Sequence, residues 1–145
     1  MKRQSIYYIS LIFIISACTV SPRPIEYGNE ECFYCKMAIV DAQHAAELVT
    51  NKGKIYVYDA IECMVAHYNE TSETEYSYEL VSDYESPGTW LNAQEASYLI
   101  SAQLPSPMGA NLNAFANSEN ANAMQQSKPG DIFNWETLIQ QLQTD

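Results

Sequence analysis

Basic residues, histidine and glycine are scarce in this chain of 145 residues. It has 7 Lys and Arg against 18 Asp and Glu, a net charge of −11, and only 2 histidines and 5 glycines. A surface this acidic argues against nucleic acid as a partner. Two histidines leave little for general acid–base catalysis. The chain also lacks a Ser-His-Asp arrangement, a phosphate-binding glycine loop and a zinc-hydrolase helix motif, so we do not expect an enzyme.

No hydrophobic run is long enough to span a bilayer, which needs about 20 apolar residues. The longest, Ile6 to Ile15, follows Lys2 and Arg3 and precedes Ser16-Ala17-Cys18. This layout predicts a secretory signal over residues 1–17. Ile15 to Cys18 also resembles the bacterial lipobox, in which the cysteine becomes the lipidated first residue. We therefore expect a lipid-anchored protein of the cell envelope that faces the periplasm from the outer membrane; an ordinary signal peptide with an unrelated cysteine is the alternative.

Cysteine is also rare, and lipidation of Cys18 would leave three thiols: Cys32, Cys35 and Cys63. An odd number of thiols in an exported protein means that at least one is free, shared between chains or chemically active. A second Cys-x-x-Cys motif is absent, which argues against a closed four-cysteine zinc site. Cys32-x-x-Cys35 precedes a predicted hairpin instead of opening a helix after a strand. This placement disfavours a thiol–disulfide oxidoreductase, which stays the alternative function.

The pattern of the first half predicts a β-β-α-β unit. Residues 18–29 contain two prolines and a glycine and are expected to form a tether, with the domain covering residues 30–145. Ala45 to Thr50 and Ile55 to Asp59 flank an Asn/Gly turn and predict a hairpin. Asp59 resembles a helix N-cap, and the helix that follows has apolar residues at i, i+3, i+4 and i+7 from Ile61. Tyr78 to Tyr84 is the next predicted strand.

The second half predicts a similar order of elements. Residues 93–100 are expected to form a short helix that runs into a strand, and residues 112–115 a second strand. A helix over 117–127, a short strand over 131–134 and a last helix over 135–142 follow. The chain is therefore assigned to the α+β class, with two β-β-α-β units in one compact domain.

Soft sulfur ligands are concentrated in two short segments. Cys35-Lys36-Met37 places a thiol and a thioether two residues apart, and Met108 lies between Pro107 and Gly109 in a predicted loop. Methionine sulfur suits Cu(I) better than Zn, and low coordination by Cys and Met leaves room for a partner's ligand. The alternatives are that Met37 fills a gap in the hydrophobic core and that Met108 is a loop residue that covers the core.

Four other side chains are weaker candidates for the site. Cys63 and His67 are four residues apart on the predicted helix and share a face, so they could bind a metal. A buried core cysteine and a structural histidine are the favoured interpretations. His44 precedes the first strand and could reach the Cys32–Met37 segment, whereas Asp59 is interpreted as a helix cap.

Together these motifs resemble the NosL family, the nitrous-oxide-reductase accessory lipoproteins. The resemblance covers residues 31–139, and its parts stand in the family's order. The matching segments are the lipobox ending at Cys18, Tyr34-Cys35-Lys36-Met37-Ala38-Ile39 with Asp41, Ala45-Ala46-Glu47-Leu48, Tyr58-Asp59-Ala60-Ile61-Glu62-Cys63-Met64, Trp90-Leu91-Asn92-Ala93, Ala96-Ser97-Tyr98 and residues 107–115.

The resemblance implies a membrane-anchored Cu(I) metallochaperone that helps to assemble the copper centres of nitrous oxide reductase in denitrification. It implies Cys35 and Met108 as the main ligands, then Met37. Cys32 and Cys63 are further candidates because their thiols could bind the same metal. A second metal position, for an ion such as Zn, would use His44 or His67. Two features depart from the family: Lys36 stands where many members have glycine, and Cys32 permits a disulfide with Cys35 that would remove the thiolate ligand.

Overall fold

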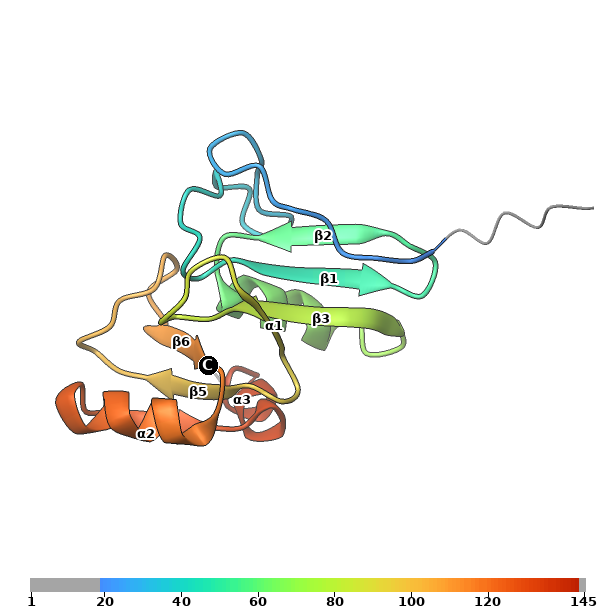
Figure 1. Cartoon of the computed structure of the whole chain (residues 1–145). Helices are drawn as coiled ribbons and strands as arrows, with labels where there is room; N and C mark the ends of the chain where they lie inside the picture. The colour runs from blue at the N-terminus through green and yellow to red at the C-terminus, as the bar shows by residue number, and fades with distance from the viewer. Residues whose placement is uncertain (1–18, 144–145) are drawn as a thin grey trace, which may run out of the picture.

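The computed structural model describes residues 19–143. The expected signal peptide, residues 1–17, and Cys18 lie outside this part of the chain. Two antiparallel sheets carry three helices, in an arrangement that repeats β-β-α-β (Figure 1). Within residues 19–143, no helix has the length and apolar character needed to cross a membrane. The expected α+β class and the two repeated units are confirmed.

The first unit is built on a four-stranded sheet in the order β2-β1-β3-β4. Its elements are β1 (Ala46–Thr50), β2 (Ile55–Tyr58), α1 (Ile61–Glu70), β3 (Tyr76–Ser82) and β4 (Trp90–Asn92). The predicted hairpin is present, with Ala46 paired to Tyr58 and Val49 to Ile55. Gly53 has a positive φ of 81°, a conformation that glycine adopts without the strain of a Cβ atom, and this allows the tight turn.

The second unit has a three-stranded sheet in the order β6-β5-β7. Its elements are β5 (Ser97–Ile100), β6 (Leu112–Phe115), α2 (Ser118–Ser127), β7 (Asp131–Phe133) and α3 (Trp135–Gln141). For residues 93–100 we expected a short helix that runs into a strand: the strand is present as β5, but the helix is wrong, because residues 93–95 form a turn. The Asn92 side chain accepts a hydrogen bond from the Gln94 backbone N–H at 2.9 Å, which favours a turn over a helix here.

One hydrophobic core joins the two units. It includes Leu48 and Tyr58 from the first sheet, Met64 from α1, Tyr98 from β5 and Leu138 from α3, all without exposed surface. Helix α1 contacts strands of both sheets, so its position is determined by both halves of the chain. The first turn of α1 is therefore held in place by both units, so its side chains can meet side chains from distant segments of the chain.

The segment before β1 packs on the sheet that carries the hairpin. Ile25 is buried in the core, and the Arg23 backbone N–H donates to the carboxylate of Glu47 in β1 at 3.1 Å. This cover explains why every residue of β1 is buried, Glu47 included, although sequence alternation would expose one face. The stretch that we expected as a tether is thus in contact with the domain from Arg23 onward. Burial raises the pKa of Glu47, whose second oxygen has no hydrogen-bond partner in the part of the chain that the structure describes.

Candidate metal centre

Residues 31–38 form a closed loop that presents two cysteines. Glu31 pairs with Ala38 in an isolated bridge, and the Cys32 backbone N–H donates to the Met37 carbonyl at 2.8 Å. The Phe33 backbone N–H donates to the Val57 carbonyl at 2.8 Å, which attaches the loop to β2. The cysteine pair is therefore held by backbone hydrogen bonds on a turn and does not begin a helix.

Lys36 lies at the tip of this turn with a left-handed backbone. Its φ is 65°, which a residue with a Cβ atom adopts at a cost of about 1 kcal/mol or more. Its ammonium group donates to the Phe33 carbonyl and lies 4.6 Å from the centre of the Phe33 ring. Glycine would adopt this backbone conformation without strain, and the side-chain contacts of Lys36 offset part of the strain here.

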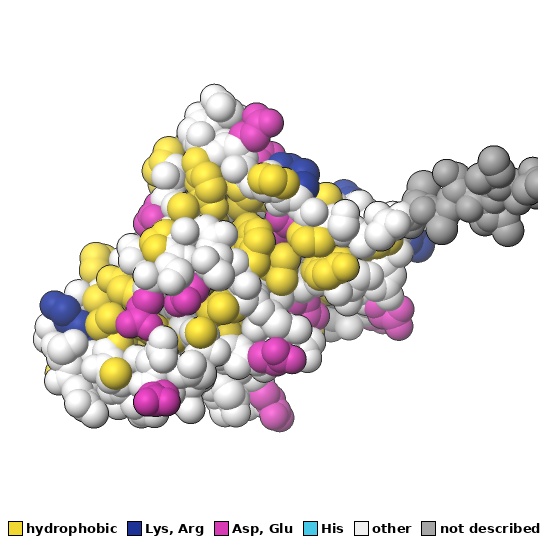
Figure 2. All heavy atoms as spheres, viewed as in Figure 1, with side chains coloured by type: hydrophobic (Ala, Val, Ile, Leu, Met, Phe, Trp, Pro, Cys, Tyr) yellow, Lys and Arg dark blue, Asp and Glu magenta, His cyan; other side chains and the backbone are white. Residues whose placement is uncertain are grey.

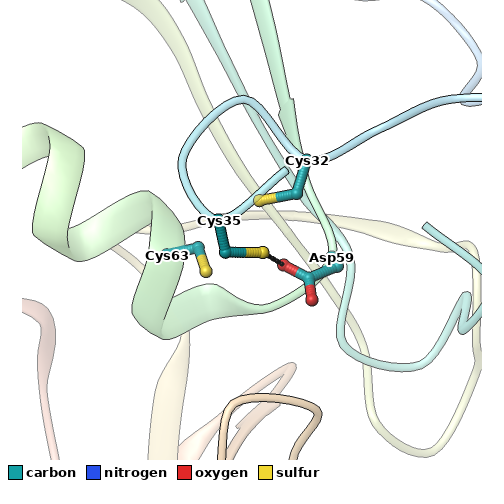
Figure 3. Close-up of side chains that lie close together, drawn as sticks. All are labelled: Cys32, Cys35, Asp59 and Cys63. Atoms are coloured by element: carbon teal, nitrogen blue, oxygen red, sulfur yellow. Dashed lines mark hydrogen bonds between the residues drawn. The ribbon is translucent and has the colours of Figure 1, made fainter. Parts of the chain in front are cut away.

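Three thiols and one carboxylate converge beside this loop. Single ligand atoms of Cys32, Cys35, Asp59 and Cys63 all lie within 4.8 Å of one another. Figure 3 shows the two loop cysteines facing Cys63 on α1 and Asp59 at the end of β2. Cys32 and Cys63 are buried, Cys35 is partly exposed, and all three thiols are free of disulfide bonds. The cluster thus unites residues separated by up to 31 positions in the chain.

Asp59 was predicted as a helix cap, and this prediction is wrong. The N-cap of α1 is Ala60, which makes no side-chain capping bond. The Oδ1 atom of Asp59 instead accepts a hydrogen bond from the Cys35 thiol at 3.3 Å. The carboxylate therefore belongs to the cluster, where it can take up a thiol proton or contribute an oxygen ligand.

The electrostatics of the cluster favour one thiolate. A hydrogen bond from the Cys63 thiol lowers the pKa of Cys32 to about 6 and raises the pKa of Cys63. Burial, together with the proximity of Cys32 and Asp59, raises the pKa of Cys35 to about 11. Cys32 is therefore the thiol of the cluster that forms a thiolate most readily. Thiolates are the form in which cysteine binds metal ions.

The two methionines expected as ligands are on the surface. Met37 is 51% exposed and lies in the same loop as Cys35, so it does not fill a core gap. Met108 is 44% exposed and lies in the loop between β5 and β6. That loop contacts α1, because the Ser106 hydroxyl donates to the carboxylate of Glu62, the residue before Cys63. Both thioethers are accessible to a partner, and their role as ligands stays a prediction.

The two histidines lie outside the cluster. His44 is buried, with Nδ1 2.7 Å from the Asp41 carboxylate and Nε2 3.0 Å from Oδ1 of Asn113. The Nδ1 atom of His67 is 2.5 Å from the Tyr58 hydroxyl, and burial lowers its pKa. Both rings thus have hydrogen-bond partners in the fold, and their role at a second metal position stays a prediction.

Hydrophobic side chains are exposed around the cysteine loop. Phe33, Tyr34, Met37 and Val40 each have more than a third of their surface accessible, and Val40 reaches 72%. Figure 2 shows hydrophobic side chains on the part of the molecule formed by this loop, with acidic groups spread over the visible face. An exposed apolar surface next to a buried ligand cluster is typical of a site that meets another protein.

Comparisons with known proteins identify the relatives of this chain. None of the curated proteins matches it. A solved structure, the crystal structure of the copper chaperone NosL from Shewanella denitrificans, has the same fold: its TM-score is 0.68 at 18% identity, over 81% of this chain and 95% of that one. The family model for NosL matches residues 24–143, which include the complete cysteine cluster and both exposed methionines. The chain therefore belongs to the NosL family.

Proposed function

We propose that this protein is a Cu(I) metallochaperone, exported and anchored to the membrane by lipid on Cys18. The observation that carries the proposal is the convergence of three thiols within one cluster. Thiolate sulfur favours soft metal ions, and the nearby thioethers of Met37 and Met108 favour Cu(I) over Zn. Membership of the NosL family and the shared fold with a copper chaperone support the same function. Copper is the cargo of this protein, which carries out no reaction on it.

Cu(I) would first bind to the exposed sulfur atoms and then pass to the buried ones. Met37 and Met108 are exposed, and a thioether needs no deprotonation to bind. Cys35 is partly exposed and leads to the buried Cys32, whose lowered pKa supplies a thiolate. Metal binding by the remaining thiols releases protons. Asp59 accepts a hydrogen bond from the Cys35 thiol and is positioned to receive its proton.

Release would follow the same path in reverse, by exchange of ligands with an acceptor protein. Because the exposed hydrophobic side chains adjoin the cysteine loop, an acceptor that binds there would bring its own ligands next to Cys35. From the family, we propose nitrous oxide reductase and its assembly machinery in the cell envelope as the acceptor. The site would face the periplasm from the outer membrane.

Thiol–disulfide exchange is the second candidate function, favoured by the lowered pKa of Cys32. The position of the pair on a turn, beside a third thiol and a carboxylate, differs from the helix start that redox motifs use. Reduction of insulin disulfides that is abolished by Cys32→Ser and unaffected by Met108→Ala would favour this function over copper transfer.

Replacement of Met108 by alanine tests the proposal. We expect the reduced protein to bind one Cu(I) per chain in competition with a chelator, and Met108→Ala to weaken this binding about tenfold or more. Met124→Ala, which removes a partly exposed methionine from α2, is the matched control and should leave the affinity unchanged. Equal affinities for all three proteins would exclude Met108 from the site, and a wild-type protein without tight Cu(I) binding would contradict the proposed function.

A further inference from the structure

A hydrogen bond joins the Met108 loop to the helix that carries the third thiol. The Ser106 hydroxyl donates to Oε1 of Glu62, and Glu62 directly precedes Cys63 in the first turn of α1. Ser106 belongs to the second β-β-α-β unit and Glu62 to the first. The bond therefore connects the two halves of the chain beside the cysteine cluster, two residues from Met108.

The hydrogen bond between Ser106 and Glu62 restricts the position of Met108, because the backbone around Ser106 has little freedom. Pro105 and Pro107 restrict the backbone on both sides of Ser106. Ser106 itself is buried, whereas its neighbours in the loop are exposed. The Gly109 backbone N–H donates to the Ser106 carbonyl at 3.0 Å, which closes a turn around Met108. A serine fixed against α1 thus fixes the base of the turn that presents the thioether.

The environment of Glu62 is unusual for a residue in the first turn of a helix. Its Oε2 atom is buried and has no hydrogen-bond partner among residues 19–143, although a glutamate at such a position can normally turn toward water. A buried oxygen without a partner destabilises the fold. Features that cost stability are concentrated at functional sites, and this one lies beside Cys63 and the Met108 loop.

We infer that Glu62 and Ser106 are positioning residues, which hold the Met108 loop against α1 so that the thioether is presented to copper at the cysteine cluster. Neither side chain needs to touch the metal. The inference rests on the proposed function for its copper readout, but the restraint on the loop exists in the metal-free protein and can be measured there.

A double-mutant cycle measures the effect on copper. Ser106→Ala removes the donor, and we expect Cu(I) affinity to fall about tenfold, as for other residues that orient a ligand. In a Met108→Ala background, the same substitution should have no further effect, because there is no thioether left to position. Glu62→Gln keeps an acceptor for Ser106 and should stay within about threefold of the wild type. Ser127→Ala, on the exposed end of α2, is the matched control.

The mobility of the Met108 methyl group, measured by NMR in the metal-free protein, provides the independent readout. We expect it to be restricted in the wild type and in Glu62→Gln, and to increase in Ser106→Ala. Unchanged mobility, or an equal loss of affinity with and without Met108, would overturn the inference. If the wild type fails to bind Cu(I), the proposed function fails, and the NMR result alone then decides whether the restraint exists.

Discussion

Replacing Cys35 by serine is expected to weaken Cu(I) binding by more than about 100-fold while the fold stays intact. Loss of residues that only support a metal ligand costs roughly 10–100-fold in affinity, so loss of a direct sulfur ligand should cost more. Cys35 is the partly exposed thiol of the cluster and contacts Asp59, whereas Cys32 and Cys63 are buried in the core. Of the three thiols, Cys35 is therefore the one whose removal should weaken Cu(I) binding with the smallest effect on the stability of the fold.

The control for this experiment keeps the number of thiols constant. Cys35→Ser combined with Ser127→Cys moves one thiol to the exposed end of α2, away from the cluster. We expect this double variant to bind Cu(I) as weakly as Cys35→Ser, and circular dichroism and thermal unfolding of both to resemble the wild type. Recovery of tight binding in the double variant would show that any accessible thiol suffices, and the assignment of the cluster would be wrong.

Replacing Gly130 by alanine is expected to destabilise the domain by about 3 kcal/mol. A Cβ atom at this position would lie 2.0 Å from the Ile100 carbonyl oxygen and 2.9 Å from Cα of Ser101. These are backbone atoms of β5 and the residue after it, so they cannot move aside as a flexible side chain could. Gly130 directly precedes β7, whose Asp131 pairs with Ile100, and the clash would disturb this pairing.

Urea unfolding measures this effect, and the midpoint of thermal unfolding should fall by roughly 10 °C. Gly88→Ala is the control, because Gly88 has a positive φ of 83° but nothing within 4 Å of the position of a Cβ atom. Its cost should be limited to backbone strain, about 1 kcal/mol. If Gly130→Ala is no more destabilising than Gly88→Ala, the close contact between Gly130 and β5 is not present in solution.

Most of the fold could be predicted from local patterns. The hairpin is marked by its β-forming residues and by Asn51 and Gly53 in the turn, and α1 by its apolar periodicity. Strand β4 was not predicted, because three residues are too few to show alternation, and its place depends on pairing with β3. The burial of Glu47 could not be predicted either, because it depends on the distant segment that contains Arg23, which covers this side of β1.

The candidate site could be predicted only in part. Cys32 and Cys35 are conspicuous because they are close in sequence, but nothing local shows that Cys63 and Asp59 lie beside them. Asp59 precedes a helix, with Glu62 three residues on, and this spacing is typical of a capping box. Its actual partner is a thiol 24 residues away. The bond between Ser106 and Glu62 spans 44 residues and has no sequence signal at all.

X-ray absorption at the copper edge, on the reduced protein loaded with one equivalent of Cu(I), tests the central claim most directly. The cluster of Cys32, Cys35 and Cys63 predicts a first shell made of sulfur. It also predicts that Cys35→Ser reduces the number of sulfur neighbours. A first shell dominated by nitrogen, as from His44 or His67, or the absence of stoichiometric copper would contradict a thiol-based copper site in this protein.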